Sequence, residues 1–143
     1  MRPADRPGPR SGGLLPAAVL VLALSGLAAG CSSSKPAYCT DASQLKASVQ
    51  DLGNVDVAKN GLGSLQTALN SVQADAKTFA ADAKSAFPSQ TAALNTALSG
   101  QQAAITSAKG QPPLTAATAV ASSVTQVKNS ANALESAASG NCQ

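Results

Sequence analysis

The sequence predicts an all-α protein, an up-down bundle of four helices whose N- and C-terminal ends are joined by a disulfide. Two long segments place apolar residues at alternating steps of three and four. Proline and glycine separate the helical segments, and Cys39 and Cys142 stand at the two ends of the helical region. The predicted bundle domain covers residues 39–142, which is enough chain for a single core.

The first predicted helix covers residues 41–52. Asp41 can cap its N-terminus, and Gln44 follows three residues later, as in a capping box. The next residues, 53–61, contain an alternating Val-Asp-Val triplet between glycine and asparagine residues. Glycine and asparagine favour turns, so we interpret this segment as a connector instead of helix.

The second predicted helix, residues 62–86, has the most regular pattern in the chain. Pro88 should end it, because proline disfavours helix at the preceding residue and has no N–H to donate. The steps of three and four predict one buried face. Its members are Leu62, Leu65, Leu69, Val72, Ala76, Phe79, Ala83 and Ala86.

The third predicted helix covers residues 89–109, and its apolar face is less regular. Leucine and isoleucine side chains share one side of it, but Gln101 interrupts them. The neighbouring Gly100 weakens a helix by about 1 kcal/mol relative to alanine. We therefore expect a kink near Gly100.

The fourth predicted helix covers residues 114–139. Lys109, Gly110 and the two prolines after Gln111 form a stop signal that also suits the start of the next helix. Two regular stripes favour packed helices over the disordered tail that an Ala- and Ser-rich composition also permits. The second stripe consists of Ala117, Val120, Val124, Val127, Ala131, Leu134 and Ala138.

The N-terminal segment has the order of a secretory signal. Three arginines lie within residues 1–10, an apolar run covers residues 14–27, and small residues precede Cys31. Residues 27–31, Leu-Ala-Ala-Gly-Cys, resemble the lipobox of bacterial lipoproteins. In that family the leucine usually stands three residues before the cysteine, whereas in this chain it stands four before it. The chain as a whole is similar in style to the small alanine-rich lipoproteins of high-GC Gram-positive (actinobacterial) species.

The resemblance implies cleavage between Gly30 and Cys31, removal of residues 1–30, and lipidation of Cys31 with diacylglyceryl and fatty-acyl (palmitate) chains. Two or more acyl chains anchor a protein stably, because each buried methylene contributes about 0.8 kcal/mol. The mature protein would be exported and lipid-anchored to the outer face of the cell membrane. Residues 31–38 would be the lipidated cysteine and a short polar tether.

Two other interpretations of this segment stay open. An uncleaved membrane span requires roughly 20 apolar residues, whereas the run in this chain is shorter and contains Pro16 and Gly26. The ordinary signal peptidase would instead release a soluble protein with a free thiol at Cys31. Acylation of Cys31 leaves an even number of cysteines, while release leaves one unpaired thiol in an oxidising compartment.

If Cys31 is acylated, Cys39 and Cys142 remain as a pair. A disulfide needs its two Cα atoms within about 7 Å of each other. An even number of antiparallel helices brings both ends of an up-down bundle together. We therefore predict this bridge, with two separate free thiols as the alternative.

The sequence shows no catalytic constellation, no metal-ligand cluster and no cofactor motif. Histidine is absent, which removes the commonest acid-base group and a common metal ligand. Beyond residue 30, seven lysines stand against six acids, so no basic stripe for nucleic acid remains. Asp75 and Asp82 could form a carboxylate pair on one helical face. Lys77 and Lys84 repeat beside them with the same spacing, however, which is typical of a solvated face.

We therefore expect a non-enzymatic helical binding or structural module that engages another envelope protein. The alternative is a carrier that holds a lipid or other apolar small molecule in the bundle core. A lean core makes a large cavity unfavourable, because aromatic residues are only 2% of the chain. They are Tyr38, Phe79 and Phe87.

Overall fold

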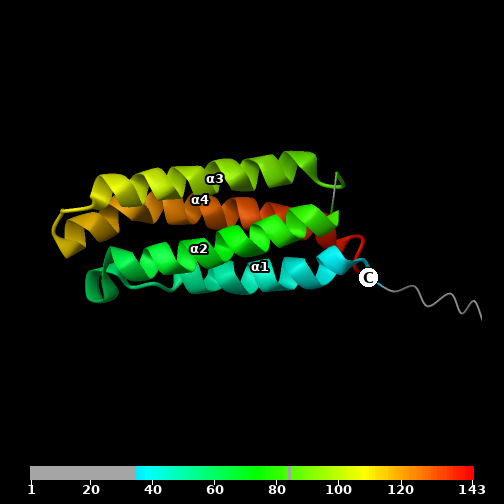
Figure 1. Cartoon of the computed structure of the whole chain (residues 1–143), viewed down its shortest axis with the longest axis horizontal. Coiled ribbons are helices and arrows are strands. Elements are labelled where there is room, and N and C mark those ends of the chain that lie inside the picture. Colours follow the sequence, from blue (N-terminus) through cyan, green and yellow to red (C-terminus); the bar gives the residue numbers. More distant parts are fainter. Residues whose placement is uncertain (1–34, 84) are drawn as a thin grey trace, which may run out of the picture. The chain divides into compact units, whose positions relative to one another are not determined.

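The computed structural model describes residues 35–83 and 85–143, and these residues form the predicted all-α bundle. Successive helices run in opposite directions (Figure 1). The α1–α2 and α3–α4 connections therefore lie at one end, and the start of α1 and the end of α4 lie at the other. The helices are α1 (Ala37–Gly53), α2 (Val57–Ala83), α3 (Pro88–Ala108) and α4 (Pro113–Ser139).

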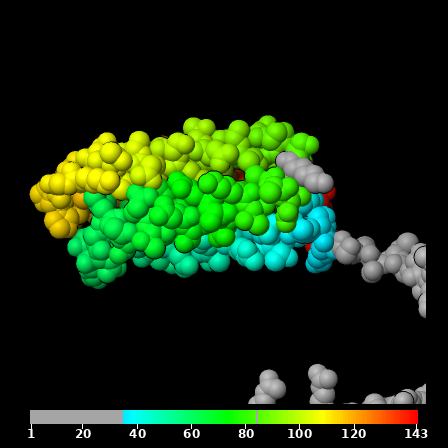
Figure 2. Space-filling view, viewed as in Figure 1, coloured from blue at the N-terminus to red at the C-terminus, as the bar shows by residue number. Residues whose placement is uncertain are grey.

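The helices pack as a ring with one diagonal contact. Contacts join α1 to α2, α2 to α3, α3 to α4 and α4 to α1, and α2 also meets α4 across the bundle. Among the described residues, no Cα atom of α1 lies within 8 Å of a Cα atom of α3. On the face shown in Figure 2, α2 and α3 cover most of α4. Small buried residues on the diagonal pair, such as Ala76 and Ala131, permit this close approach.

The predicted apolar faces of α2 and α4 supply about half of the core. Val124, Leu62 and Ala117 are only partly buried, whereas Ala86 is exposed and lies beyond the end of α2. The bundle interior is filled mainly by aliphatic side chains, and Phe79, Phe87 and the polar Gln101 are buried with them. The largest apolar side chains with less than 2% of their surface exposed are Phe79, Leu52, Leu65, Leu69, Leu94, Ile105, Leu134, Val72, Val120 and Val127.

The start of α1 differs from the prediction. The helix begins at Ala37, with Pro36 at the N-cap and no side-chain cap, so the predicted capping box at Asp41 is wrong. The φ of −53° at Pro36 is already close to the helical value, which allows the helix to begin directly after it. Tyr38, which the sequence placed in the tether, is therefore helical, and Asp41 lies inside α1 and is buried.

The predicted connector 53–61 is also shorter than expected, because α2 begins at Val57. A carboxylate oxygen of Asp56 accepts a hydrogen bond from the backbone N–H of Lys59 at 3.1 Å and so caps the first turn. The helix then breaks at Gly61, whose φ of 76° lies in the left-handed region that glycine adopts easily. The segment is thus one helical turn followed by a kink.

The kink predicted at Gly100 is absent, and α3 passes through this residue as one helix. Gly100 is exposed, while the next residue, Gln101, and Ile105 are buried on the packed face. Packing of that face holds the helix together where the local propensity is low. The predicted breaks at both ends of α3 are confirmed: Pro88 is its first residue, and Gly110 beyond its end has a φ of 82°.

Candidate functional site

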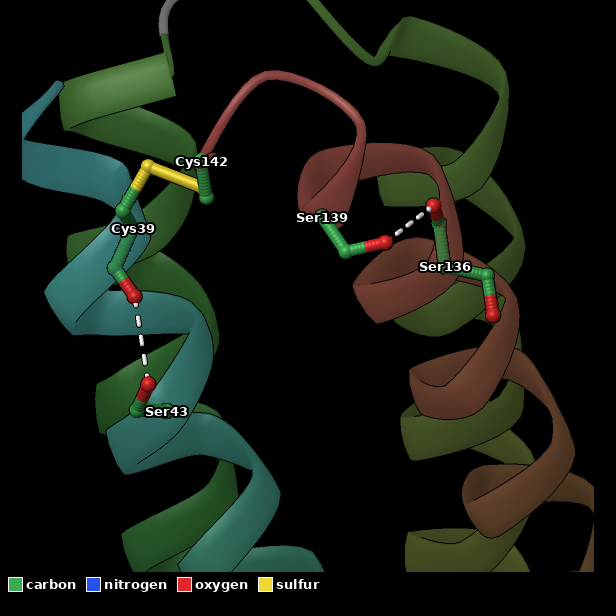
Figure 3. Close-up of a disulfide and its surroundings, with 5 residues drawn as sticks. All are labelled: Cys39, Ser43, Ser136, Ser139 and Cys142. Carbon is green, nitrogen blue, oxygen red and sulfur yellow. Dashed lines mark hydrogen bonds between the residues drawn. A yellow bond between two sulfur atoms is a disulfide. The ribbon is translucent and has the colours of Figure 1, made fainter. Parts of the chain in front are cut away.

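The bundle is closed by the predicted disulfide between Cys39 and Cys142, whose Cα atoms lie 5.7 Å apart. Cys39 belongs to the first turn of α1, and Cys142 follows α4 in a short turn (Figure 3). The backbone N–H of Cys142 donates to the carbonyl oxygen of Ser139 at 3.1 Å, which continues the chain tightly from α4. The bridge encloses 103 positions of sequence.

All three aromatic residues of the chain gather at this disulfide end. The ring of Tyr38 lies edge-on to Phe79 and Phe87, with centroid distances of 6.0 and 5.4 Å. The two phenylalanine rings lie 5.9 Å apart. Such pairs contribute about 0.5–1.5 kcal/mol beyond their buried area. The cluster joins α1, α2 and the α2–α3 turn, so it strengthens the same end that the disulfide closes.

A buried carboxylate, Asp41, lies in α1 two residues beyond Cys39. It is 8% exposed, and its Oδ2 has no hydrogen-bond partner in the protein. Burial raises the pKa of this carboxyl, and the neighbouring carboxyl groups of Asp82 and Asp75 raise it further. The two α2 carboxylates are therefore not an isolated solvated pair. Among the described residues, no group of three potential ligands is arranged to hold a metal ion.

A second buried polar group, Gln101, lies inside the bundle on α3. Its side chain is fully buried, and neither Nε2 nor Oε1 has a hydrogen-bond partner in the protein. The side chain of the next residue, Gln102, does have a hydrogen-bond partner. The amides of Gln102 and Gln66 form a reciprocal pair between α3 and α2, with donor to acceptor distances of 2.9 and 3.1 Å. The interruption that the sequence showed at Gln101 is thus a polar residue within the core.

A hollow of about 360 Å³ lies between the α1–α2 connection and α4, at the end away from the disulfide. Its apolar lining comes from α1, the connection, α2 and α4. Gly53 and three residues with polar or charged side chains, Asp56, Thr125 and Lys128, complete the wall. The apolar lining residues are Leu52, Val55, Val57, Leu65, Ala117, Val120, Ala121 and Val124.

The structure thus brings Cys39 and Cys142 together, whereas Gly30 and Cys31 lie outside the described residues. The burial of Asp41 was missed, although its four-residue spacing from Leu45 places it on the buried face of α1. The hollow had no signal in the sequence, because it depends on how the connection folds beside α4. In the described part of the chain, no helix combines the length and apolar character that crossing a membrane requires.

Comparison with known proteins gives no relative for this chain: it matches no family of proteins, no curated protein and no solved structure.

Proposed function

We propose that this protein is a cell-envelope lipoprotein, exported, cleaved before Cys31 and anchored by lipid at that residue to the outer face of the membrane. Its bundle is a non-enzymatic binding or structural module. The observation that carries the proposal is the lipobox-like sequence at residues 27–31, placed shortly before a bundle whose two ends are tied together by Cys39 and Cys142.

The disulfide supports export, because such bridges persist in oxidising compartments. It also accounts for both cysteines of the bundle, so Cys31 is the one cysteine left to accept lipid. Because the core is thin, the bridge is important for the stability of the bundle. Closing a loop of 103 positions contributes roughly 4–5 kcal/mol on the chain-entropy account, a large share of the stability of a small domain.

The same geometry predicts which end of the anchored bundle faces the membrane. Residues 32–36 separate Cys31 from α1, and five residues reach at most about 18 Å when extended. The disulfide end would therefore sit near the lipid. The two helix connections lie at the other end, about 30 Å away along the 21 residues of α3. Leu114, 74% exposed at that far end, is available there to a partner protein.

Mass spectrometry of the mature N-terminus, after partition of the cells' protein between detergent and water, tests the anchor. We expect the wild-type chain in the detergent phase with acylated Cys31 as its first residue. Cys31→Ser should lose the lipid, and the double variant Cys39→Ser/Cys142→Ser should keep it, since those sulfurs belong to the bundle. Unmodified Cys31 at a released N-terminus, or an uncleaved chain beginning at Met1, would contradict the proposal.

Site-specific crosslinking in the intact envelope tests the binding role. A photoreactive residue in place of Leu114 should give a discrete adduct with an envelope protein. The same residue in place of the exposed Thr40, next to the disulfide, is the matched control and should give less of it. Equal yields from the two positions, or no adduct at either, would count against a partner that binds the far end.

A further inference from the structure

We propose that the hollow beside α4 binds an amphiphilic monocarboxylate, of the chemical class of a medium-chain fatty acid. The inference rests on the proposed role as a binding module and adds a ligand class to it. The site lies on the side of the bundle, between the α1–α2 connection and the first half of α4. It borders the filled bundle interior, because its lining includes the core residues Leu52, Leu65 and Val120.

The size and lining of the hollow suit a short hydrocarbon chain. Its volume of about 360 Å³ falls within the range of pockets that bind small molecules, roughly 300–1,000 Å³. Eight of its twelve lining residues are aliphatic. Val55 and Val57, at the connection and the start of α2, line the same hollow as Val120 and Val124 of α4. An apolar chain lying in the hollow would contact Val55 of the connection and Val124 of α4, the two lining valines that are only partly buried.

The charges around the hollow favour an anion over a cation. The carboxylate of Asp56 is already engaged, because its Oδ2 lies 3.2 Å from Nζ of Lys59 and its Oδ1 accepts the backbone N–H of that residue. Lys128, by contrast, forms no salt bridge with any described residue. The remaining charge on the wall of the hollow is thus one ammonium group, which matches one carboxylate.

The position of Lys128 is set by a close approach between α4 and the end of α1. A Cβ atom at Gly53 would come within 3.2 Å of Cδ of Lys128 and 3.4 Å of its Nζ. The lysine side chain therefore lies across the bare backbone of Gly53, with its charge at the edge of the apolar lining. A carboxylate head group could meet the ammonium there while its chain lies between Val55 and Val124.

Photolabelling of the full chain, as cells produce it, tests this site. The probes are an octanoic acid carrying a diazirine on its chain and the corresponding primary amide, which has the same chain without the charge. We expect the acid to label the segment around Val120 and Val124 up to about fivefold more than the amide, as an exposed ion pair allows. An excess of unlabelled octanoate should suppress this labelling.

Two variants of α4 separate the charge from the cavity. Lys128→Gln should abolish the preference for the acid, while Lys109→Gln, the same change away from the hollow, should preserve it. Ala121→Leu should fill the hollow and reduce labelling by both probes. Ala119→Leu, an exposed position on the same helix outside the lining, is its control and should leave labelling unchanged.

Gly53→Ala gives a further test that does not alter charge. The new methyl group must displace the stem of Lys128, so the acid preference should fall although the lysine is still present. Alanine favours helix over glycine, so loss of folding is not the expected cause. The proposal is overturned if acid and amide label the wild-type segment equally, or if Ala121→Leu and Ala119→Leu behave alike.

The same digest reports the state of Cys31, so the two proposals fail independently. Labelled α4 with unmodified Cys31 would support the ligand site and contradict the lipid anchor. Acylated Cys31 without competable labelling would support the anchor and reject the carboxylate site.

Discussion

The fully buried amide of Gln101 should lower the stability of the bundle, and Gln101→Met should raise it. Both polar atoms are buried without a partner in the protein, and one unsatisfied buried group costs about 1–3 kcal/mol. Methionine has a similar length and shape and removes both atoms. A volume-conserving exchange costs less than about 1.5 kcal/mol. We therefore expect a net gain of about 1–3 kcal/mol and a rise in Tm of roughly 5–20 °C for a domain of this size.

Thermal and urea unfolding of the oxidised protein, followed by far-ultraviolet circular dichroism, measure this gain. The urea midpoint should rise at an unchanged slope, because the surface exposed on unfolding hardly changes. Gln102→Met is the matched control. It breaks the reciprocal amide pair with Gln66 and should cost about 1 kcal/mol. A Gln101→Met protein no more stable than wild type would refute the assignment of an unsatisfied amide to the core.

Three further predictions concern the disulfide end. Burial first, and then Asp82, raise the pKa of Asp41 in the folded protein. The protonated carboxyl therefore makes its full contribution to stability below the unfolded pKa of about 3.8, and this contribution is lost as pH rises through the folded pKa. Asp41→Asn should therefore raise Tm by several degrees at pH 7 but not at pH 3, and an equal gain at both would contradict this. Cys39→Ser/Cys142→Ser should cost roughly 4–5 kcal/mol in urea unfolding; a loss below about 1 kcal/mol would rule out the bridge as a major stabiliser. Phe79→Ala, at a site with no exposed surface, should cost about 3–5 kcal/mol, and a loss typical of surface sites would show that the aromatic cluster is not tightly packed.

The helices could be predicted from the sequence because each helix buries one face, so its apolar residues recur at steps of three and four. The stripe from Leu65 to Ala83 fits that period, and each of its members is buried in α2. The disulfide followed from the same topology, since four antiparallel helices return the chain to its starting end. The predicted helix boundaries were less accurate, because they depend on capping and turn-forming residues as well as on the period of the buried face. Pro36 starts α1 without a side-chain cap, and Asp56 caps a helical turn inside the segment that glycine and asparagine marked as a connector.

The candidate sites were harder to predict because each depends on contacts between segments distant in sequence. The hollow exists because residues 55–57 fold beside Val120 and Val124. The perturbed carboxyl of Asp41 depends on Asp82 of α2, which lies 41 positions later in the chain. Periodicity assigns a residue to a buried or an exposed face, but it does not specify which side chain from another helix comes next to it.

The buried amide and the disulfide are connected through the stability of the whole domain. A bundle with three aromatic residues and many alanines has little surplus stability to offset an unsatisfied polar group, so the bridge allows the fold to tolerate Gln101. Gln101 lies thirteen positions after Pro88, which is at the disulfide end, so the two are about 20 Å apart along the helix axis. At that distance the two effects should add within about 0.5 kcal/mol. Gln101→Met introduced into the Cys39→Ser/Cys142→Ser protein should therefore restore about 1–3 kcal/mol in urea unfolding, the same increment as in the oxidised protein. An increment present in only one of the two backgrounds would show that the amide and the bridge act on a common element, so that their contributions to stability are not independent.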